Sequence, residues 1–205
     1  MLALAPHTDD SEFGAGGMLA RLVSEGADVH SVAFSVPRES LPPGYGPNTL
    51  EDEFREASAI LGIPNTNLHV FDFPVRHLPR CRQEVLEEMV RMQRELDPDL
   101  VLVHASTDVH QDHQTVQAEA LRAFKRTTIL GYELPWNNIQ FQAHALIALE
   151  PEHIKTKIAA IAAYKSQSHR PYSDPEFLEG WARLRGVTIG RPLAEAFEVI
   201  RWVIR

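Results

Sequence analysis

The chain lacks the cysteines that a disulfide-rich fold or a thiolate metal site would need. Cys81 is its single cysteine among 205 residues. One thiol cannot form an internal disulfide, and thiolate zinc sites draw on several cysteines. The sequence therefore excludes both kinds of framework, and a metal site in this chain has to use imidazole and carboxylate ligands.

Basic charge and long apolar segments are also scarce. Lys and Arg number 20 against 28 Asp and Glu, which gives a formal net charge of -8. An acidic chain of this kind is a poor candidate for non-specific nucleic-acid binding, which needs a basic surface. No apolar run approaches the roughly 18 residues of a membrane span, and residues 1–6 are too short for a signal peptide. We expect a soluble cytoplasmic protein without a transmembrane segment or a nucleic-acid partner.

The apolar content that is present suits a sizeable core, since 44% of the residues are hydrophobic. Short apolar runs alternate with segments of helical periodicity, which indicates an α/β fold with a mostly parallel sheet flanked by helices. No repeat or linker divides the chain, so one domain over residues 1–205 is predicted. The predicted strands are 2–5, 29–35, 68–73, 100–104, 128–132, 144–149 and 197–203. The predicted helices are 16–25, 50–61, 83–96, 114–124, 151–165 and 174–185.

Two clusters of acidic and histidine residues follow two of the predicted strands. The first is A-P-H-T-D-D-S-E at residues 5–12, and the second is D-V-H-Q-D-H at residues 108–113. Ligands of open α/β sheets bind beyond the carboxyl ends of the strands, where both clusters are expected. Ionisable groups there are costly to bury unless a metal or a substrate engages them. The six groups are His7, Asp9, Asp10, His110, Asp112 and His113.

Three of these residues are predicted metal ligands. His7 and Asp10 are three residues apart, so both can point inward as the chain turns into the next helix. His113 comes from the other strand end. Imidazole and carboxylate ligands suit Zn²⁺ or Fe²⁺, and three protein ligands leave an open position for water. The pattern therefore indicates a metal-dependent hydrolase.

The other three residues are assigned to the chemistry around the metal. Asp9 is expected to take a proton from water on the metal, whose pKa the metal lowers to about 7. His110 lies near several carboxylates and is expected to stay protonated, so that it stabilises an oxyanion or protonates a leaving amine. Asp112 is expected to bind one of the histidines and to fix its tautomer or charge.

Simpler structural roles compete with these assignments. Residues 9–11 can cap a helix, and residues 108–113 can be a solvated helix entry. The glycines that follow the first cluster invite a dinucleotide-binding interpretation, but the last glycine of that fingerprint would fall on Leu19. We expect these glycines to let the turn pack tightly against the sheet. They are Gly14, Gly16 and Gly17.

One further histidine and two segments are candidates for lining the site, whereas four other histidines are not. His104 ends the strand at 100–104 and is a secondary candidate for lining the site. The loop at 37–47, with four prolines and two glycines, is long enough to shape a pocket rim. Aromatic residues such as those at 132–136 more often belong to a core than to a sugar-binding surface, but the polar residues within 132–138 also allow a pocket wall. Four histidines without an acidic cluster are expected to be structural or surface residues. These are His30, His69, His144 and His153.

The two clusters resemble the motifs of a known family. A-P-H-T-D-D-S-E-F-G-A-G-G is similar to the A-H-P-D-D-E opening of the LmbE-like, or PIG-L, N-acetylglucosaminyl deacetylases, and D-V-H-Q-D-H-Q-T-V is similar to their H-P-D-H motif. The likeness continues through an E-x-x-x-A-x-x-x-L-G pattern that begins at Glu53, and through residues 157–167, 183–186 and 194–197. This chain departs from the family pattern at Thr8, which replaces a proline, and at Ser11, which lengthens the gap to the following glutamate.

The resemblance implies a Rossmann-like fold and a mononuclear zinc hydrolase that removes acetyl from an N-acetylglucosamine unit of a sugar conjugate. Carried over residue by residue, it places the same three metal ligands, the base at Asp9 and the oxyanion stabiliser at His110. Arg76 matches a substrate-contacting arginine, whereas Leu50 stands where an arginine is often found. Zn²⁺ is the implied cofactor, and Fe²⁺ suits the same ligands.

Partners and alternatives follow from the same resemblance. The implied partner is an N-acetylated amino sugar or a glycoconjugate, and a homo-oligomer is compatible because family members often assemble. Two other functions stay open at this stage. One is a metal-stabilised sugar-binding or regulatory protein without turnover, and the other is a hydrolase of a different amide.

Overall fold

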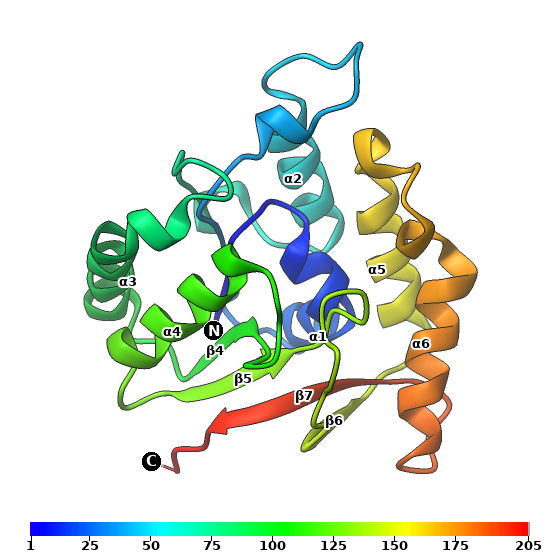
Figure 1. Cartoon of the computed structure of the whole chain (residues 1–205). Coiled ribbons are helices and arrows are strands. Elements are labelled where there is room, and N and C mark those ends of the chain that lie inside the picture. Colours follow the sequence, from blue (N-terminus) through cyan, green and yellow to red (C-terminus); the bar gives the residue numbers. More distant parts are fainter. Residues whose placement is uncertain (205) are drawn as a thin grey trace.

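A seven-stranded sheet forms the middle of the computed structural model, which describes residues 1–204 (Figure 1). Its strands are β1 (Leu2–Ala5), β2 (His30–Ala33), β3 (Leu68–Val70), β4 (Leu100–His104), β5 (Thr128–Tyr132), β6 (Ala145–Ala148) and β7 (Ala194–Arg201). Their order across the sheet is β3-β2-β1-β4-β5-β7-β6. The first five strands run parallel, whereas β7 runs antiparallel to both β5 and β6.

Helices cover both faces of this sheet. They are α1 (Asp10–Ser24), α2 (Thr49–Ile60), α3 (Arg82–Leu96), α4 (Gln111–Ala123), α5 (Pro151–Ala162) and α6 (Pro175–Val187). The helices α3 and α4 pack on one face, and the other four pack on the opposite face (Figure 1). Within residues 1–204, none of the helices combines the length and apolar character needed to cross a bilayer. The predicted α/β fold with a mostly parallel sheet is confirmed.

The continuous apolar runs of the sequence reflect burial on both faces of the sheet. All four residues of β1 are fully buried. Leu2 and Leu4 pack with α3 and α4, whereas Ala3 packs with the helices on the other face. A strand buried on both sides carries no polar alternation, which is typical of parallel sheets between two helical layers.

The prediction of where the first helix begins was wrong, because α1 starts at Asp10 rather than at residue 16. The three glycines lie inside this helix and not in a turn. A Cβ at Gly14 would clash with the ring of Tyr132, and one at Gly16 would lie 2.8 Å from Lys157 Cγ. Close packing against β5 and α5 therefore favours glycine here, despite its low helix propensity.

The end of the chain also differs from the prediction. The helix expected at 151–165 ends at Ala162, and the last strand begins at Ala194 and not at residue 197. Glu195 explains why the beginning of this strand is hard to see in the sequence. It is buried, accepts hydrogen bonds from the backbone N–H groups of Gly17 and Met18, and pairs with Lys157 at 2.7 Å. These partners lie far away in the sequence, so the local pattern shows only a charged residue.

The strand order places a crevice between β1 and β4. From β1 the sheet extends through β2 to β3 on one side, and through β4 to β5 on the other. At such a switch point, the connections that leave neighbouring strands lead to opposite faces and open a space at their carboxyl ends. Both acidic-histidine clusters follow these two strands, so the topology brings them together.

Candidate active site

A cavity of about 260 Å³ lies at the carboxyl ends of β1 and β4. Residues of both clusters form its floor. The loop at 37–47 and the stretch 132–138 supply walls of this cavity. The segment between α5 and α6 supplies a further wall, which received no role from the sequence although the family resemblance reaches its first residues. The lining residues outside the two clusters include Pro37, Ser40, Trp136, Asn137, Gln167, Arg170 and Tyr172.

The first cluster is fixed by the turn from β1 into α1. Asp10 occupies the first turn of the helix, and its Oδ2 accepts a hydrogen bond of 2.9 Å from the backbone N–H of His7. This short loop brings the two side chains face to face, with His7 Nδ1 3.2 Å from Asp10 Oδ2. Both residues are buried, with 8% and 7% of their surface exposed.

The second cluster is fixed by the turn from β4 into α4. His110 is the N-cap residue of α4, and its Nδ1 accepts a hydrogen bond of 3.1 Å from the backbone N–H of Asp112. The buried Asp108 accepts the backbone N–H of His110 at 2.8 Å through Oδ1. Its other carboxylate oxygen lies 2.8 Å from His113 Nδ1. The turn is therefore held by its own polar side chains.

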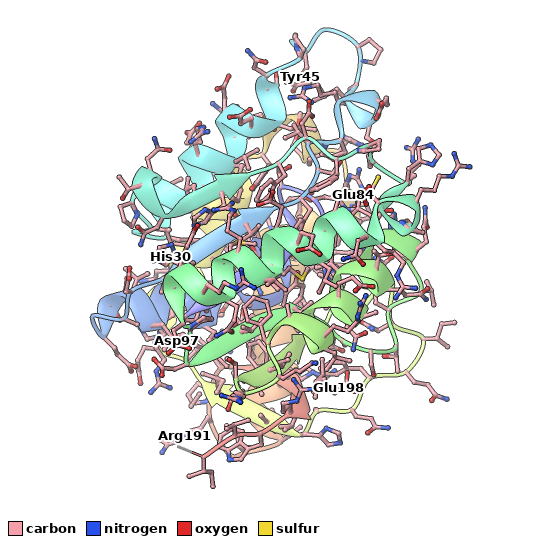
Figure 2. All side chains as sticks on the ribbon, turned by 90° about the vertical axis from the view of Figure 1, so that its left-hand side faces the viewer. His30, Tyr45, Glu84, Asp97, Arg191 and Glu198 are labelled. Carbon is pink, nitrogen blue, oxygen red and sulfur yellow. The ribbon has the colours of Figure 1, made fainter. Side chains whose placement is uncertain are left out.

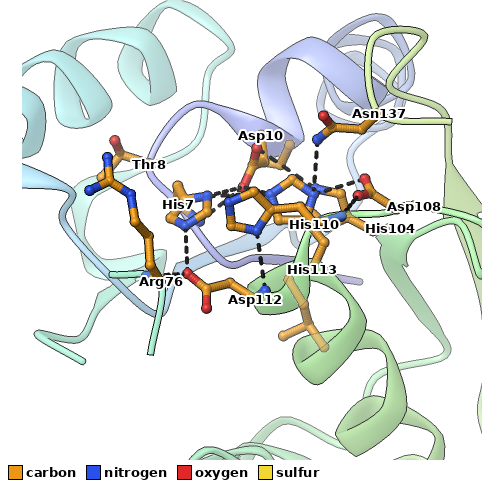
Figure 3. Close-up of polar contacts among 12 residues, drawn as sticks. His7, Thr8, Asp10, Arg76, His104, Asp108, His110, Asp112, His113 and Asn137 are labelled. Atoms are coloured by element: carbon orange, nitrogen blue, oxygen red, sulfur yellow. Dashed lines mark hydrogen bonds and ion pairs between the residues drawn. The ribbon is translucent and has the colours of Figure 1, made fainter. Parts of the chain in front are cut away.

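Three potential ligand atoms converge at one point on the cavity floor (Figure 3). His7 Nδ1 lies 3.2 Å from Asp10 Oδ2 and 3.3 Å from His113 Nε2, and the latter two atoms are 3.5 Å apart. Ligands at about 2.0–2.1 Å from a tetrahedral Zn²⁺ are separated from each other by about 3.3 Å. The separations of these three atoms therefore match those of ligands around one metal ion, and all three residues line the cavity.

His7 and His113 each have a second ring nitrogen, which points away from the potential metal position and faces a carboxylate. His113 Nδ1 faces Asp108, and His7 Nε2 lies 3.2 Å from Oδ2 of the buried Asp112. A carboxylate on one ring nitrogen holds the proton there and leaves the lone pair of the other nitrogen free for a metal. Both histidines are thus oriented as metal ligands usually are.

The charges around His7 also favour a cation at this point. Burial lowers the pKa of His7, but the carboxylates of Asp10 and Asp112 outweigh burial and raise it to about 10. Although burial alone raises the pKa of Asp10, the imidazoles of His113, His104 and His7 lower it well below its ordinary value. The two shifts favour a positively charged imidazole at His7 beside a negatively charged carboxylate at Asp10.

Asp9 borders the cavity beside these ligands. It is the N-cap residue of α1, but its side chain makes no capping hydrogen bond. Burial, and then the neighbouring Asp10, raise the pKa of Asp9 to about 6, against the lowering effect of His7 and Arg170. The carboxylate is therefore available in the cavity and titrates close to neutral pH.

His110 also lines the cavity, but the prediction that it stays protonated was wrong. Burial and the neighbouring His113 and His7 lower the pKa of His110 to about 4. Its Nδ1 accepts the backbone N–H of Asp112 and so carries no proton. His110 is neutral at pH 7, with its one ring proton on Nε2.

Arg76 lies at the cavity in an unusual backbone conformation. Its φ of 66° is in the left-handed region, which non-glycine residues seldom adopt. Its backbone N–H donates to Asp112 Oδ2 at 2.6 Å, and its guanidinium donates to Ser40 Oγ at 3.2 Å. The carboxylate that contacts His7 therefore also fixes the backbone of this arginine.

Sequence reasoning missed several residues of the site. Asp108 begins the second cluster but received no role, although it contacts His113 directly. Arg170 donates to Gln167 Oε1 at 2.6 Å and to the hydroxyl of Tyr172, which holds it at the cavity wall. A D-x-x-x-x-H spacing would have been a signal for Asp108. In the wall at 165–173, the family resemblance reaches only residues 165–167, and residues 168–173 carry no motif.

Comparison with known proteins is consistent with this geometry. The family model described as PIG-L, GlcNAc-PI de-N-acetylase, matches residues 2–124, which include both clusters. The chain is 29% identical over 170 residues to the uncharacterized deacetylase YaiS of Escherichia coli, covering 81% of this chain and 90% of that one. It is 31% identical over 123 residues to the diacetylchitobiose deacetylase of Thermococcus kodakarensis, covering 56% of this chain and 45% of that one.

Solved structures extend the likeness to the whole chain. The conserved protein TT1542 of Thermus thermophilus matches with a TM-score of 0.83 and 26% identity, over 100% of this chain and 95% of that one. The 4-carboxy-2-hydroxymuconate hydratase GalB of Pseudomonas putida shares the fold, with a TM-score of 0.79 and 18% identity, over 100% of this chain and 97% of that one. The fold alone therefore does not determine the reaction, whereas the family match covers more than half of the chain and both clusters. The chain belongs to the PIG-L, GlcNAc-PI de-N-acetylase, family.

Proposed function

We propose that the chain is a metal-dependent hydrolase that removes the N-acetyl group from an N-acetylglucosamine unit of a sugar conjugate. The observation that carries this proposal is the convergence of His7, Asp10 and His113 on one point, beside the carboxylate of Asp9. Zn²⁺, or Fe²⁺, held by these three residues would supply a Lewis acid that polarises the acetyl carbonyl and acidifies a water molecule.

Asp9 is the proposed general base. A pKa of about 6 suits a group that accepts and returns a proton near neutral pH. Asp9 takes a proton from water as the water oxygen bonds to the acetyl carbon. When the C–N bond breaks, Asp9 returns that proton to the amine nitrogen. The products are acetate and a free amino sugar.

His110 is the proposed hydrogen-bond donor to the oxyanion. Because Nδ1 accepts a backbone N–H, the ring proton sits on Nε2. A neutral imidazole can donate this proton in a hydrogen bond to the developing negative charge of the tetrahedral species. His110 thus acts without the positive charge that the sequence suggested, and the leaving amine receives its proton from Asp9.

The cavity walls suit a sugar. Trp136 and Tyr172 stack with ring centroids 3.9 Å apart and an interplanar angle of 10°, which gives an aromatic wall. Arg76 and Arg170 offer guanidinium donors for hydroxyl groups, and Arg76 is the proposed substrate contact. The relative from Thermococcus kodakarensis is named for its action on diacetylchitobiose, which supports an N-acetylated amino sugar as the substrate class.

An acetate-release assay tests this proposal. Metal-free and Zn²⁺-loaded protein would each be given a panel of N-acetylglucosamine glycosides, nucleotide sugars and glycolipids. We expect acetate from at least one of these compounds with the loaded protein alone. Binding without acetate release would favour a sugar-binding protein, and acetate or another acid from non-sugar amides alone would favour a different amidase.

A further inference from the structure

A row of hydrogen bonds leads from α2 to the cavity wall between α5 and α6. Glu53 in α2 is buried and accepts two hydrogen bonds from Ser166, one from the backbone N–H at 2.9 Å and one from the hydroxyl at 2.6 Å. The Ser166 hydroxyl accepts from Nε2 of Gln167 at 3.1 Å, and the amide oxygen of Gln167 accepts from Nε of Arg170 at 2.6 Å. Gln167 and Arg170 line the cavity, whereas Glu53 does not.

The two ends of this row fix its direction. A guanidinium only donates hydrogen bonds, and an ionised carboxylate only accepts them. The single hydroxyl proton of Ser166 goes to Glu53, so the hydroxyl oxygen is left to accept from Gln167. The amide of Gln167 therefore points its NH₂ group at Ser166 and its oxygen at Arg170. Turned the other way, the amide would set its NH₂ group against an N–H of the guanidinium.

Arg170 keeps donors for a ligand. A guanidinium has five N–H groups, and besides Gln167 the hydroxyl of Tyr172 is the only acceptor of Arg170 side-chain hydrogen bonds within residues 1–204. Both acceptors are neutral. Tyr172 also stacks on Trp136, so the guanidinium is tied to the aromatic part of the wall. Because Arg170 lines the cavity, its remaining N–H groups are available to oxygen atoms of a sugar.

We propose that Arg170 binds an oxygen atom of the sugar and that Glu53 is the residue that positions Arg170, through Ser166 and Gln167. This inference rests on the proposed function, because the ligand is the N-acetylated sugar of that proposal. The carboxylate of Glu53 sets the orientation of the Gln167 amide, and the amide oxygen holds the guanidinium. A group that is already held loses less freedom on binding than a mobile one, so the row of hydrogen bonds strengthens binding.

A purely structural role for Glu53 explains less of this geometry. The hydrogen bond from the backbone N–H of Ser166 would by itself tie the turn at 165–167 to α2. The Ser166 hydroxyl and the Gln167 amide continue from that tie to a cavity residue. Buried polar side chains near the site do not all reach the cavity in this way. His104, the secondary candidate from the sequence, is fully buried and does not line it.

Reversal of the hydrogen bonds separates the two roles. In Glu53→Gln the amide at position 53 can donate to Ser166, whose hydroxyl then donates to the oxygen of Gln167 and draws it away from Arg170. In the double variant Glu53→Gln/Gln167→Glu, the reversed hydroxyl donates to one carboxylate oxygen at position 167, and Arg170 donates to the other. Both variants lose the carboxylate at position 53, but only the double variant keeps a correctly placed acceptor for Arg170.

The test is the affinity of metal-free protein for the methyl glycoside of N-acetylglucosamine, measured by calorimetry with excess chelator. We expect Arg170→Ala to bind about tenfold more weakly than wild type, since a hydrogen bond to a charged group is worth at least that much. Glu53→Gln should bind about three- to tenfold more weakly, and the double variant should stay within about twofold of wild type. In an Arg170→Ala background, Glu53→Gln should cause no further loss.

If Glu53→Gln does not fold, Ser166→Ala takes its place in the same comparison. This variant removes the hydroxyl from the row but keeps the backbone N–H that binds Glu53. Its loss of affinity should likewise disappear in the Arg170→Ala background.

Other outcomes would contradict the inference. Wild-type protein that did not bind the glycoside, or Arg170→Ala that bound it as tightly as wild type, would show that Arg170 does not hold this sugar. An equal loss from Glu53→Gln with and without Arg170, or a double variant as weak as Glu53→Gln, would show that Glu53 serves the fold alone. The expected binding pattern without acetate release by Zn²⁺-loaded wild type would instead overturn the proposed function and leave this inference intact.

Discussion

Two groups of imidazole and carboxylate side chains belong to the same sheet but are arranged differently. At the carboxyl ends of β1 and β4, potential ligand atoms of His7, Asp10 and His113 lie within 3.5 Å of one another. Near the amino end of β2, His30 lies between His69 and Asp28. Its Nδ1 is 3.2 Å from His69, and its Nε2 is 3.3 Å from Asp28 (His30 is labelled in Figure 2).

The difference shows that composition alone does not make a metal site. The two ring nitrogens of His30 contact two different residues, His69 and Asp28, on opposite sides of the ring. The three side chains therefore stand in a row and do not point toward one common position. At the candidate site, the buried carboxylates of Asp108 and Asp112 each occupy one nitrogen of a histidine and leave the other free to converge. Asp28, by contrast, has 80% of its side chain exposed. Buried partners that orient the imidazoles distinguish the two groups.

Replacement of one histidine from each group should give the largest contrast. His113→Ala removes a proposed ligand, so we expect it to lose Zn²⁺ binding by more than the roughly 10–100-fold that loss of an orienting partner costs. His69→Ala should keep one Zn²⁺ per chain. Metal analysis after gel filtration measures both. Metal retained by His113→Ala, or lost by His69→Ala, would reverse the comparison.

Asp9→Asn should separate metal binding from turnover. Asn keeps the shape of the side chain but cannot accept the proton from water. We expect kcat to fall about 10²–10⁴-fold, which is the usual contribution of a general base, while the metal content stays at the wild-type level. Asp28→Asn is the matched control and should leave kcat unchanged. A near-normal kcat in Asp9→Asn would exclude Asp9 as the base.

The orienting carboxylates should have a smaller effect. Asp108→Asn keeps a hydrogen-bonding group beside His113 Nδ1 but allows the wrong tautomer, so Zn²⁺ affinity should fall about 10–100-fold. Chelator competition measures this change. Asp28→Asn should bind Zn²⁺ as wild type does. If both variants bound Zn²⁺ as tightly as wild type, buried carboxylates would not be what distinguishes the two groups.

The pH dependence of metal-free stability should also differ between the two groups. Burial and Asp10 raise the pKa of Asp9 to about 6, whereas a hydrogen bond from Asn67 lowers the pKa of Asp28. The folded protein therefore holds the proton of Asp9 more tightly than the unfolded chain does. The stability linked to this proton is fully present below the unfolded pKa and is lost as pH rises through about 6.

Metal-free Asp9→Asn should accordingly be more stable than metal-free wild type at pH 7.5, by about 1–3 kcal/mol. The difference should shrink as pH falls to 4.5. Denaturant unfolding with excess chelator measures it at both pH values. Asp28→Asn should not gain stability at pH 7.5, because its carboxylate is favoured in the folded state. A constant difference for Asp9→Asn at both pH values would show that the ionisation of Asp9 is not its cause.

Much of the fold could be predicted because its signals are local. The alternation of buried strands and amphipathic helices indicated the parallel part of the sheet, and the ends of β4 and β5 agree with the prediction. The start of α1 could not be predicted, since the need for Gly14 comes from the ring of Tyr132, more than a hundred residues away. The antiparallel direction of β7 is likewise set by tertiary pairing.

The candidate site could be predicted to the extent that its residues lie in the two clusters. His7 and His113 come together because parallel strands share a carboxyl edge, which the sequence pattern already implies. The charge of His110 could not be predicted, because it depends on a backbone N–H and on two histidines that approach it in space. The wall with Arg170 could not be predicted either, because it depends on a contact between distant parts of the chain. Glu53 in α2 accepts hydrogen bonds from the backbone N–H and the hydroxyl of Ser166, which lies in the same wall.

Titration of chelated protein with Zn²⁺, with acetate release as the readout, tests the central claim most directly. The substrate is whichever N-acetylglucosamine conjugate of the panel the loaded enzyme accepts. Wild-type activity should rise from near zero to a plateau at one Zn²⁺ per chain, and His113→Ala should stay inactive at the same Zn²⁺ concentrations. Full activity without Zn²⁺ or another metal, or wild-type activity in His113→Ala, would contradict the account.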